Sequence, residues 1–401
     1  MSASRTPRYV IALLVLSATA LFASNTFPLK DRLIVHEWGT FTSIAGLDGV
    51  ALDWRPLNGP SELPGFIHTA YSTAPGAGCL DPRFNLKLSW RAKIRMETPV
   101  LYFYADRDTT ASVKVDFPKG QITEWYPRAR WVGAGIDWGA VEVLPATNVD
   151  FPIESRDNPY YAARQTDAAS LRVAGRGADQ HEKFLFYRGL GSFDLPLSAR
   201  LEPEKVVVKN LGGVETVVLF ENRGGKVGYA IKDLSQTEVA LDRPALEQTT
   251  ASLEPELERM LVMHGLYQKE AQAMIRTWRH SWFEEGLRVF YVVPREVTDA
   301  VLPITIEPKP AALVRILVGR MEIITPEMES ALQQSVARLA DPSVEVRHAV
   351  METIRKYGRF SEPILQRTWQ GTTDTGVRSR LDELFRSAPV FAGGRADAGC
   401  R

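Results

Sequence analysis

The feature that most constrains the fold is a change in hydrophobic spacing along the chain. Between residues 95 and 252, short runs such as ASVKVDFP alternate apolar and polar side chains, and Gly, Pro or Asn separates one run from the next. Such alternation predicts strands with one buried face, and many short strands separated by turns are typical of a β-sandwich. The stretch Asn222-Arg223-Gly224-Gly225 lies between two alternating runs and predicts a hairpin turn.

Two later parts of the chain show the spacing of helices. In QKEAQAMIRTWRHSWFEEG, within residues 253–325, apolar side chains recur every three or four residues, and the strand-like run LRVFYVVP follows. This part is therefore predicted to be α+β. After Thr325-Pro326 the chain is predicted to be helical, because Thr is a good N-cap and Pro suits the first helical position.

One stretch of the helical part has a recognisable pattern. LADPSVEVRHAVMETIRKYG contains Asp341 as a predicted N-cap and Gly358 as a predicted C-cap. The stretch resembles a repeat of the HEAT type, and this resemblance implies a small stack of helix pairs. A plain helical cap on the β domains is the alternative interpretation.

These patterns predict a mainly β protein with α+β character. A β-sandwich-like body is followed by an α+β segment and by a small C-terminal α-helical domain of HEAT-like type. The predicted boundaries are a signal peptide (1–23), an irregular loop-rich segment with the first strand (24–94), the β-sandwich-like domain (95–252), the α+β segment packing on the β body (253–325), the helical domain (326–388) and a flexible tail (389–401).

The N-terminus predicts export. Arg5 and Arg8 precede the almost wholly apolar run YVIALLVLSATALFA, in which Ala18 and Ala20 form an A-x-A cleavage site. The run is shorter than the roughly 20 residues that a spanning helix needs. We therefore expect a periplasmic or extracellular protein of bacterial type with no membrane span in the mature chain. An uncleaved N-terminal membrane anchor is the alternative.

The charge balance argues against a nucleic-acid partner. Lys and Arg number 48, as do Asp and Glu, so the formal net charge is zero. A neutral chain has no overall field that would draw it to nucleic acid. An envelope protein or polysaccharide is the partner class that fits export, and the sequence indicates no oligomeric state.

Cysteines and motifs identify no cofactor. Cys79 and Cys400 are the two cysteines of the chain, and either a disulfide between them or two free thiols fits the sequence. Phosphate-binding loops, dinucleotide-binding fingerprints and C-x-x-C pairs do not occur in the sequence.

The first candidate site is the stretch His36-Glu37-Trp38 at the end of a strand-like run. Strand alternation directs His36 and Trp38 to one face and Glu37 to the other. One hypothesis makes His36 a metal ligand or general base with Glu37 as a nearby carboxylate. The alternative is structural, with His36 bonded to a carbonyl group, Glu37 paired with an arginine and Trp38 packed in the core.

The second candidate site lies in TWRHSWFEEG. His280 and Glu284 are four residues apart, so on a continuous helix they share a face. That spacing allows both side chains to bind one metal ion, or Glu284 to orient His280. A solvent-exposed His–Glu pair is the alternative interpretation.

The stretches VHEWGTFTS, RMETPVLYFY, ITEWYP and TWRHSWFEEGLRVFYVVP resemble those of a group of exported bacterial proteins without an established activity. The resemblance implies secretion and a shared β-rich body, and it transfers no site residue. We keep two functional hypotheses. The first is a binding or structural interaction protein of the cell envelope. The alternative is a secreted metal-dependent hydrolase, with His36, Glu37, His280 and Glu284 as catalytic candidates and His36, His280 and Glu284 as metal ligands.

Overall fold

A computed structural model describes residues 32–57, 63–70, 90–147, 149–154, 157–175 and 177–386. The predicted signal peptide, the tail and both cysteines lie outside these described residues. The predicted fold class is confirmed, because the described chain is mainly β with several sheets, α+β character and a C-terminal helical segment.

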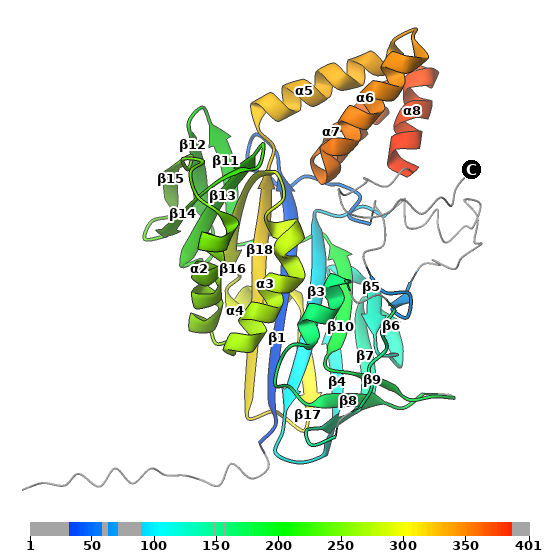
Figure 1. The fold of residues 1–401 in the computed structure, drawn as a ribbon, viewed down its shortest axis with the longest axis vertical. Helices are drawn as coiled ribbons and strands as arrows, with labels where there is room; N and C mark the ends of the chain where they lie inside the picture. Colours follow the sequence, from blue (N-terminus) through cyan, green and yellow to red (C-terminus); the bar gives the residue numbers. More distant parts are fainter. Residues whose placement is uncertain are drawn as a thin grey trace, which may run out of the picture. The chain divides into compact units, whose positions relative to one another are not determined.

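The largest sheet joins strands from distant parts of the chain (Figure 1). Its central strand β1 pairs in parallel with β18, and the other neighbouring pairs of this sheet are antiparallel. In spatial order its described strands are β14 (Lys226–Asp233), β13 (Thr216–Arg223), β16 (Gly286–Val292), β18 (Ala312–Ile323), β1 (Ile34–Ala45), β3 (Ile94–Tyr104), β10 (Leu185–Gly191), β5 (Gly120–Tyr126) and β2 (His68–Thr69).

Two smaller antiparallel sheets pack on one face of the large sheet. One contains β17 (Ile304–Glu307), β4 (Thr109–Asp116), β7 (Gly135–Leu144), β8 (Ser170–Val173) and β9 (Gln180–Glu182), with β6 (Trp131–Gly133) beside β7. The other contains β11 (Leu197–Glu202), β12 (Lys205–Asn210) and β15 (Glu238–Asp242). Apolar side chains of all three sheets form one core between the layers, including Val35, Leu101, Leu317, Val113, Val141 and Val206.

Helices cover the opposite face of the large sheet. Figure 1 shows α2 (Thr250–Met263) and α3 (Gln268–Trp282) lying across this face. The 3-10 helix η1 (Pro159–Arg164) contacts α3, and the short helix α4 (Arg295–Val301) contacts β18. A second core forms under α2, α3 and η1, with Trp38, Val100 and Phe290 from the sheet and Leu257, Trp278 and Trp282 from the helices.

The C-terminal part is helical, as the sequence predicts. It contains α5 (Pro326–Ala337), η2 (Arg338–Ala340), α6 (Val344–Lys356), η3 (Gly358–Phe360), α7 (Ser361–Gly371) and α8 (Thr375–Arg386). Thr325 caps α5, because its hydroxyl accepts a hydrogen bond from the Met328 N–H at 3.2 Å. The N-cap of α6 is Ser343 and not Asp341, whose carboxylate instead accepts the Ser343 N–H just before the helix.

The predicted hairpin turn can be compared with the backbone. Arg223 pairs with Lys226, so Gly224 and Gly225 form the two-residue hairpin turn, with φ values of 60° and 78°. Positive φ at both positions is the geometry that favours glycine in such turns.

Among the helices of the described residues, none combines the length and the apolar composition needed to cross a membrane.

Candidate functional site

The central strand β1 directs its side chains alternately to the two interiors of the protein. Its pairing with β18 is regular from Ile34 to Ala45, so even-numbered residues face α3 and odd-numbered residues face the smaller sheets. His36 and Trp38 therefore lie under the helices, whereas Glu37 lies between the sheets. This is the alternation that the sequence predicts.

Glu37 forms a buried ion pair with Arg315. The Arg315 Nε donates a hydrogen bond to its carboxylate at 2.5 Å, and the Tyr187 hydroxyl donates another. Arg315 also donates to Asp299 at 2.8 Å and to the Leu302 carbonyl at 2.7 Å. Burial and the Glu37 charge raise the pKa of Tyr187, which keeps this hydroxyl a donor. Glu37 therefore fastens the large sheet to the layer beside it.

His36 pairs with a carboxylate that sequence reasoning did not identify. Its Nδ1 lies 2.8 Å from Glu270 Oε2, and both side chains are buried. Glu270 lies in the first turn of α3, where it also accepts the Tyr267 N–H at 2.8 Å. The Tyr104 hydroxyl donates to the other carboxylate oxygen at 2.8 Å.

The structure does not bring His36 and His280 together. His36 contacts Glu270 in the first turn of α3, whereas His280 is exposed in the last turn. Ten residues of helix separate Glu270 from His280, which corresponds to about 15 Å at 1.5 Å per residue. The two imidazoles therefore do not bind one metal ion. No cluster of three or more His, Cys, Asp or Glu suited to a metal is found in the described ranges.

His280 and Glu284 do not lie on one continuous helix, because α3 ends between them. The helix stops at Trp282, before Glu284. The Arg288 guanidinium caps this end, since it donates to the carbonyls of Trp282 at 2.7 Å and Glu284 at 2.6 Å. Carbonyl groups at a helix end lack partners within the helix, and Arg288 supplies one here.

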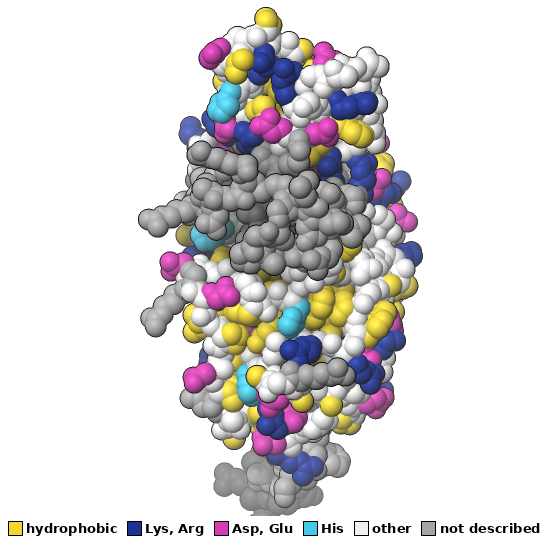
Figure 2. Space-filling view, turned by 90° about the vertical axis from the view of Figure 1, so that its right-hand side faces the viewer, with side chains coloured by type: hydrophobic (Ala, Val, Ile, Leu, Met, Phe, Trp, Pro, Cys, Tyr) yellow, Lys and Arg dark blue, Asp and Glu magenta, His cyan; other side chains and the backbone are white. Residues whose placement is uncertain are grey.

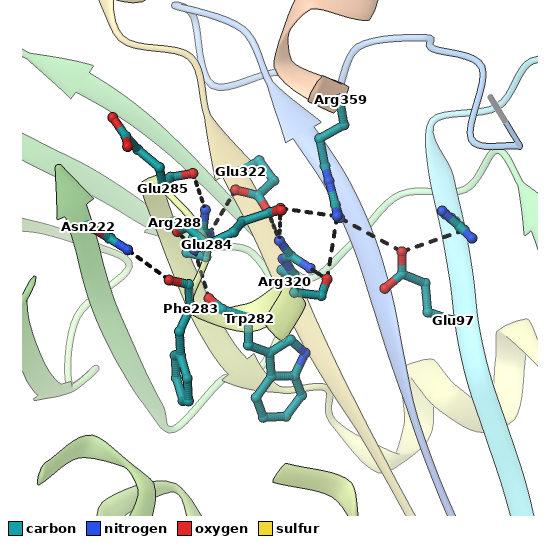
Figure 3. A network of polar contacts seen from close by, with 12 residues as sticks. Glu97, Asn222, Trp282, Phe283, Glu284, Glu285, Arg288, Arg320, Glu322 and Arg359 are labelled. Carbon is teal, nitrogen blue, oxygen red and sulfur yellow. Dashed lines mark hydrogen bonds and ion pairs between the residues drawn. The ribbon is translucent and has the colours of Figure 1, made fainter. Parts of the chain in front are cut away.

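Glu284 joins a group of charged side chains that we call the arginine cluster (Figure 3). The cluster lies where α3 ends, on the face of the large sheet that the helices cover. Its members are Arg95, Arg188, Arg288, Arg320 and Arg359 together with Glu97, Glu284 and Glu322.

The cluster connects three parts of the fold. Arg320 of β18 contacts Glu322 at 2.5 Å and donates to Glu284 at 2.7 Å. Arg288 of β16 donates to the other oxygen of Glu322 at 2.9 Å. Arg359 of η3 lies 3.0 Å from Glu284 and 3.9 Å from Glu97 of β3, so the C-terminal helices contribute to the same network, as Figure 3 shows.

Positive charge exceeds negative charge in the arginine cluster. It contains five arginines and three glutamates, an excess of two positive charges. Counting Glu124, which lies opposite Arg188 on β5, still leaves an excess of one. Burial and the like charge of Arg359 lower the pKa of the Arg320 guanidinium. Burial alone would raise the pKa of Glu97, but the surrounding arginines, first Arg95, hold it below its usual value.

Unpaired hydroxyl groups lie beside these charges. Thr40 pairs across the sheet with Glu97, and Thr42 lies between Arg320 and Arg95 on neighbouring strands. Both threonines are fully buried, and neither hydroxyl has a hydrogen-bond partner among the described residues. Buried polar groups nearly always have a partner, so this position suits a ligand or water that supplies one.

The backbone next to the cluster is strained. Thr98 has a φ of 47°, a conformation that a β-branched residue rarely adopts. The pairing of β1 with β3 shifts register between Trp38 and Thr40, which marks a bulge at this point. Arg188 donates to the Thr98 hydroxyl at 3.2 and 3.1 Å. Bulges and strained residues concentrate at ligand sites, so this geometry agrees with a functional role for the cluster.

A comparison with models of known protein families finds no match for this chain. A comparison with curated proteins also finds no similar sequence. The functional site is therefore inferred from the geometry alone.

Sequence reasoning identified Glu284 but not its partners. A usable signal lies in ALVRILVGRMEII, where alternation places Arg320 and Glu322 on the same face as the apolar Ile316 and Val318. Charged residues on the buried face of a strand need a partner or a ligand.

On the face seen in Figure 2, Lys and Arg are interspersed with Asp and Glu over the described surface, in contrast to the buried arginine cluster.

Proposed function

We propose that this protein is an exported binding protein of the cell envelope whose ligand presents an anionic group to the arginine cluster. The anionic group is a phosphate, sulfate or carboxylate. The observation that carries the proposal is the buried excess of guanidinium groups beside unpaired threonine hydroxyls. Export is proposed from Arg5, Arg8 and the apolar run that follows, which lie outside the described residues.

The energetics favour a bound anion. Removing a charge from water costs several kcal/mol per ion unless an opposite charge and hydrogen bonds compensate for it. An oxyanion would balance the excess of positive charge and accept hydrogen bonds from guanidinium and hydroxyl groups together. Thr40 and Thr42 would then gain the partners that they lack in the described structure.

The outer members of the cluster are partly exposed, which a ligand site requires. Arg320 is fully buried, but the side chains of Arg95 and Glu284 are 18% and 21% exposed. The anion would therefore enter beside Arg95 and Glu284 and contact Arg320 below them. The rest of the ligand would remain outside, which suits an envelope polysaccharide or protein that carries the anionic group. The C-terminal helices, proposed to be HEAT-like, supply Arg359 to the same site.

Calorimetry with simple anions tests the proposal. The mature chain is titrated with sodium phosphate, sulfate and acetate at constant ionic strength, with chloride as the reference. We expect saturable binding, and a rise in the free energy of unfolding of about 2.7 kcal/mol when the anion is present at 100 times its Kd. Arg320→Met should abolish binding.

The control is Arg223→Met, because the Arg223 side chain is 65% exposed and lies outside the cluster. This variant should bind as the wild type does. Absence of saturable binding, or equal binding by wild type and Arg320→Met, would contradict the proposal.

A further inference from the structure

One unpaired atom at the arginine cluster differs in kind from the donors around it. Arg320 Nε and the hydroxyls of Thr40 and Thr42 are buried and can each donate a hydrogen bond. Glu97 Oε2 is also buried, but it is a carboxylate oxygen. None of these four atoms has a hydrogen-bond partner among the described residues. A ligand that only accepts hydrogen bonds would satisfy the first three atoms and leave Glu97 Oε2 without a partner.

The surroundings of Glu97 make it an acceptor. Its Oε1 lies 3.5 Å from Arg95 and 3.9 Å from Arg359, whereas Oε2 has no hydrogen bond. Burial alone would raise the pKa of Glu97, but the charges of Arg95 and Arg359 hold it below its usual value. The carboxylate is therefore ionised at neutral pH, and an ionised carboxylate only accepts hydrogen bonds. The partner that Oε2 lacks is a donor.

The strand order brings this acceptor and the donors to one place. The central strand β1 lies between β18, which carries Arg320, and β3, which carries Glu97 (Figure 3). On β1, Thr40 pairs with Glu97 and Thr42 pairs with Arg320. Neighbouring strands lie about 4.8 Å apart, so the two long side chains start about 10 Å apart and can reach one ion over β1. Such an ion meets several donors and one ionised acceptor together.

We propose that the arginine cluster binds a phosphate group that carries a proton. This assignment rests on the anion-binding function proposed above and names its ligand. The phosphate oxygens accept from Arg320 and from the threonine hydroxyls, and the P–OH group donates to Glu97 Oε2. Sulfate and acetate carry no proton at neutral pH, so their oxygens would face the ionised Glu97 oxygen without a hydrogen bond. Inorganic phosphate keeps at least one proton at neutral pH and therefore fits both kinds of partner.

The first test compares inorganic phosphate with sulfate by calorimetry on the wild-type mature chain at pH 7.5 and constant ionic strength. Phosphate should bind at least about tenfold more tightly, because a site that hydrogen-bonds a ligand O–H rejects analogues without it. Equal affinities would overturn the proposal. Glucuronate, a carboxylate beside hydroxyl groups, should also bind less tightly than phosphate. Equal or tighter binding of glucuronate would place the donor on a sugar hydroxyl and overturn the assignment to phosphate.

Methyl phosphate separates the proton from the rest of the phosphate group. A phosphate monoester loses its second proton with a pKa of about 6, so about 3% of it keeps that proton at pH 7.5 and about nine-tenths at pH 5. Relative to inorganic phosphate, methyl phosphate should bind at least about tenfold more weakly at pH 7.5 than at pH 5. An affinity ratio that does not change with pH would overturn the proposal.

Inorganic phosphate is the reference at each pH, because it keeps a proton at both. The charged groups that face Glu97 are Arg95, Arg188, Arg320 and Arg359, and any titration of the protein affects both ligands alike. Binding of inorganic phosphate alone at pH 5 would identify free phosphate as the ligand. Binding of both at pH 5 would extend the site to phosphate groups on larger molecules.

Glu97→Gln tests the acceptor directly. Both anions gain from the loss of the negative charge, and the amide oxygen can still accept from phosphate, but sulfate also gains the amide N–H as a donor. The preference for phosphate should therefore fall below about threefold. The matched control is Glu215→Gln, because the Glu215 side chain is 82% exposed. This control should keep the wild-type preference.

The outcomes separate this proposal from the function on which it rests. If no anion binds saturably, both are overturned. If anions bind saturably but Glu97→Gln keeps the full preference for phosphate, the protonated phosphate is overturned and anion binding remains. The wild-type comparisons with sulfate and methyl phosphate decide the question if Glu97→Gln does not fold.

Discussion

Arg315 and Arg320 offer a matched test of the difference between a structural ion pair and a ligand site. Both lie on β18, and the side chains of both are fully buried, but they point to opposite faces of the sheet. We consider the change of each arginine to methionine, which keeps an apolar chain of similar reach and removes the guanidinium. The two variants should differ in stability and in their response to phosphate.

The loss of stability in Arg315→Met should be large. The Glu37 carboxylate takes its hydrogen bonds from Arg315, at 2.5 Å, and from the Tyr187 hydroxyl. Without the arginine, a fully buried carboxylate keeps a single neutral donor. Breaking one side of a buried ion pair costs about 3–5 kcal/mol. We therefore expect the free energy of unfolding to fall by about this amount.

The loss of stability in Arg320→Met should be smaller. Each carboxylate that Arg320 contacts has a second guanidinium: Glu322 keeps Arg288 at 2.9 Å, and Glu284 keeps Arg359 at 3.0 Å. The change also removes one of the excess positive charges. The lost hydrogen bonds to Glu284 and Ser281 cost about 0.5–3 kcal/mol each. The relief of repulsion between arginines and of the burial of one charge offsets part of this cost, so we expect a smaller total fall than in Arg315→Met.

Urea unfolding followed by circular dichroism measures both losses. The first series uses chloride buffer without phosphate or sulfate, at pH 7. The second adds saturating phosphate, which should stabilise wild type and Arg315→Met but leave Arg320→Met unchanged. If Arg320→Met loses as much stability as Arg315→Met in chloride, the carboxylates of the cluster depend on Arg320. The inferred excess of positive charge would then be wrong.

Three further changes test the packing and the charges around the same site. Thr42→Val removes a buried unpaired hydroxyl, so it should leave the thermal unfolding midpoint in chloride within a few degrees of wild type and weaken phosphate binding in calorimetry. Glu97→Gln should tighten phosphate binding, since it removes a negative charge. The pKa of Glu97 is lowered in the folded protein. Its stabilising contribution is therefore complete above the unfolded pKa of about 4.3 and disappears as the pH falls through the folded value. Urea unfolding of wild type and Glu97→Gln should differ at pH 6 and converge in acid; a constant difference would contradict this. Gly319→Ala places a Cβ 2.1 Å from the Tyr291 ring and should cost about 1–3 kcal/mol by overpacking, and an unchanged thermal midpoint would show that the ring moves aside.

Local patterns in the sequence predicted the parts of this fold that depend on neighbouring residues. Strand alternation placed His36 and Glu37 on opposite faces, and the Gly-Gly hairpin and the Thr325 cap follow from residues adjacent in sequence. The parallel pairing of β1 with β18 could not be predicted in this way. It joins strands almost 280 residues apart, and no local spacing encodes such a pairing.

The same limit applies to the candidate sites. His36 finds its partner Glu270 across 234 residues, and Glu37 finds Arg315 across 278. The His280–Glu284 spacing was a local inference, but it assumed that the helix continues. The helix stops after Trp282, where a side chain from the next strand, Arg288, bonds to the carbonyls at its end. Tertiary contacts decided each of these outcomes.

The position of β1 explains why its polar residues are informative. It lies between β18 and β3, so its side chains alternate between two interiors. A polar residue on such a strand needs a partner from the protein or from a ligand. Glu37 has Arg315 and His36 has Glu270, but the hydroxyls of Thr40 and Thr42 have none within the described ranges. These two residues face the positively charged cluster, so an oxyanion is the partner that satisfies the strand and the cluster together.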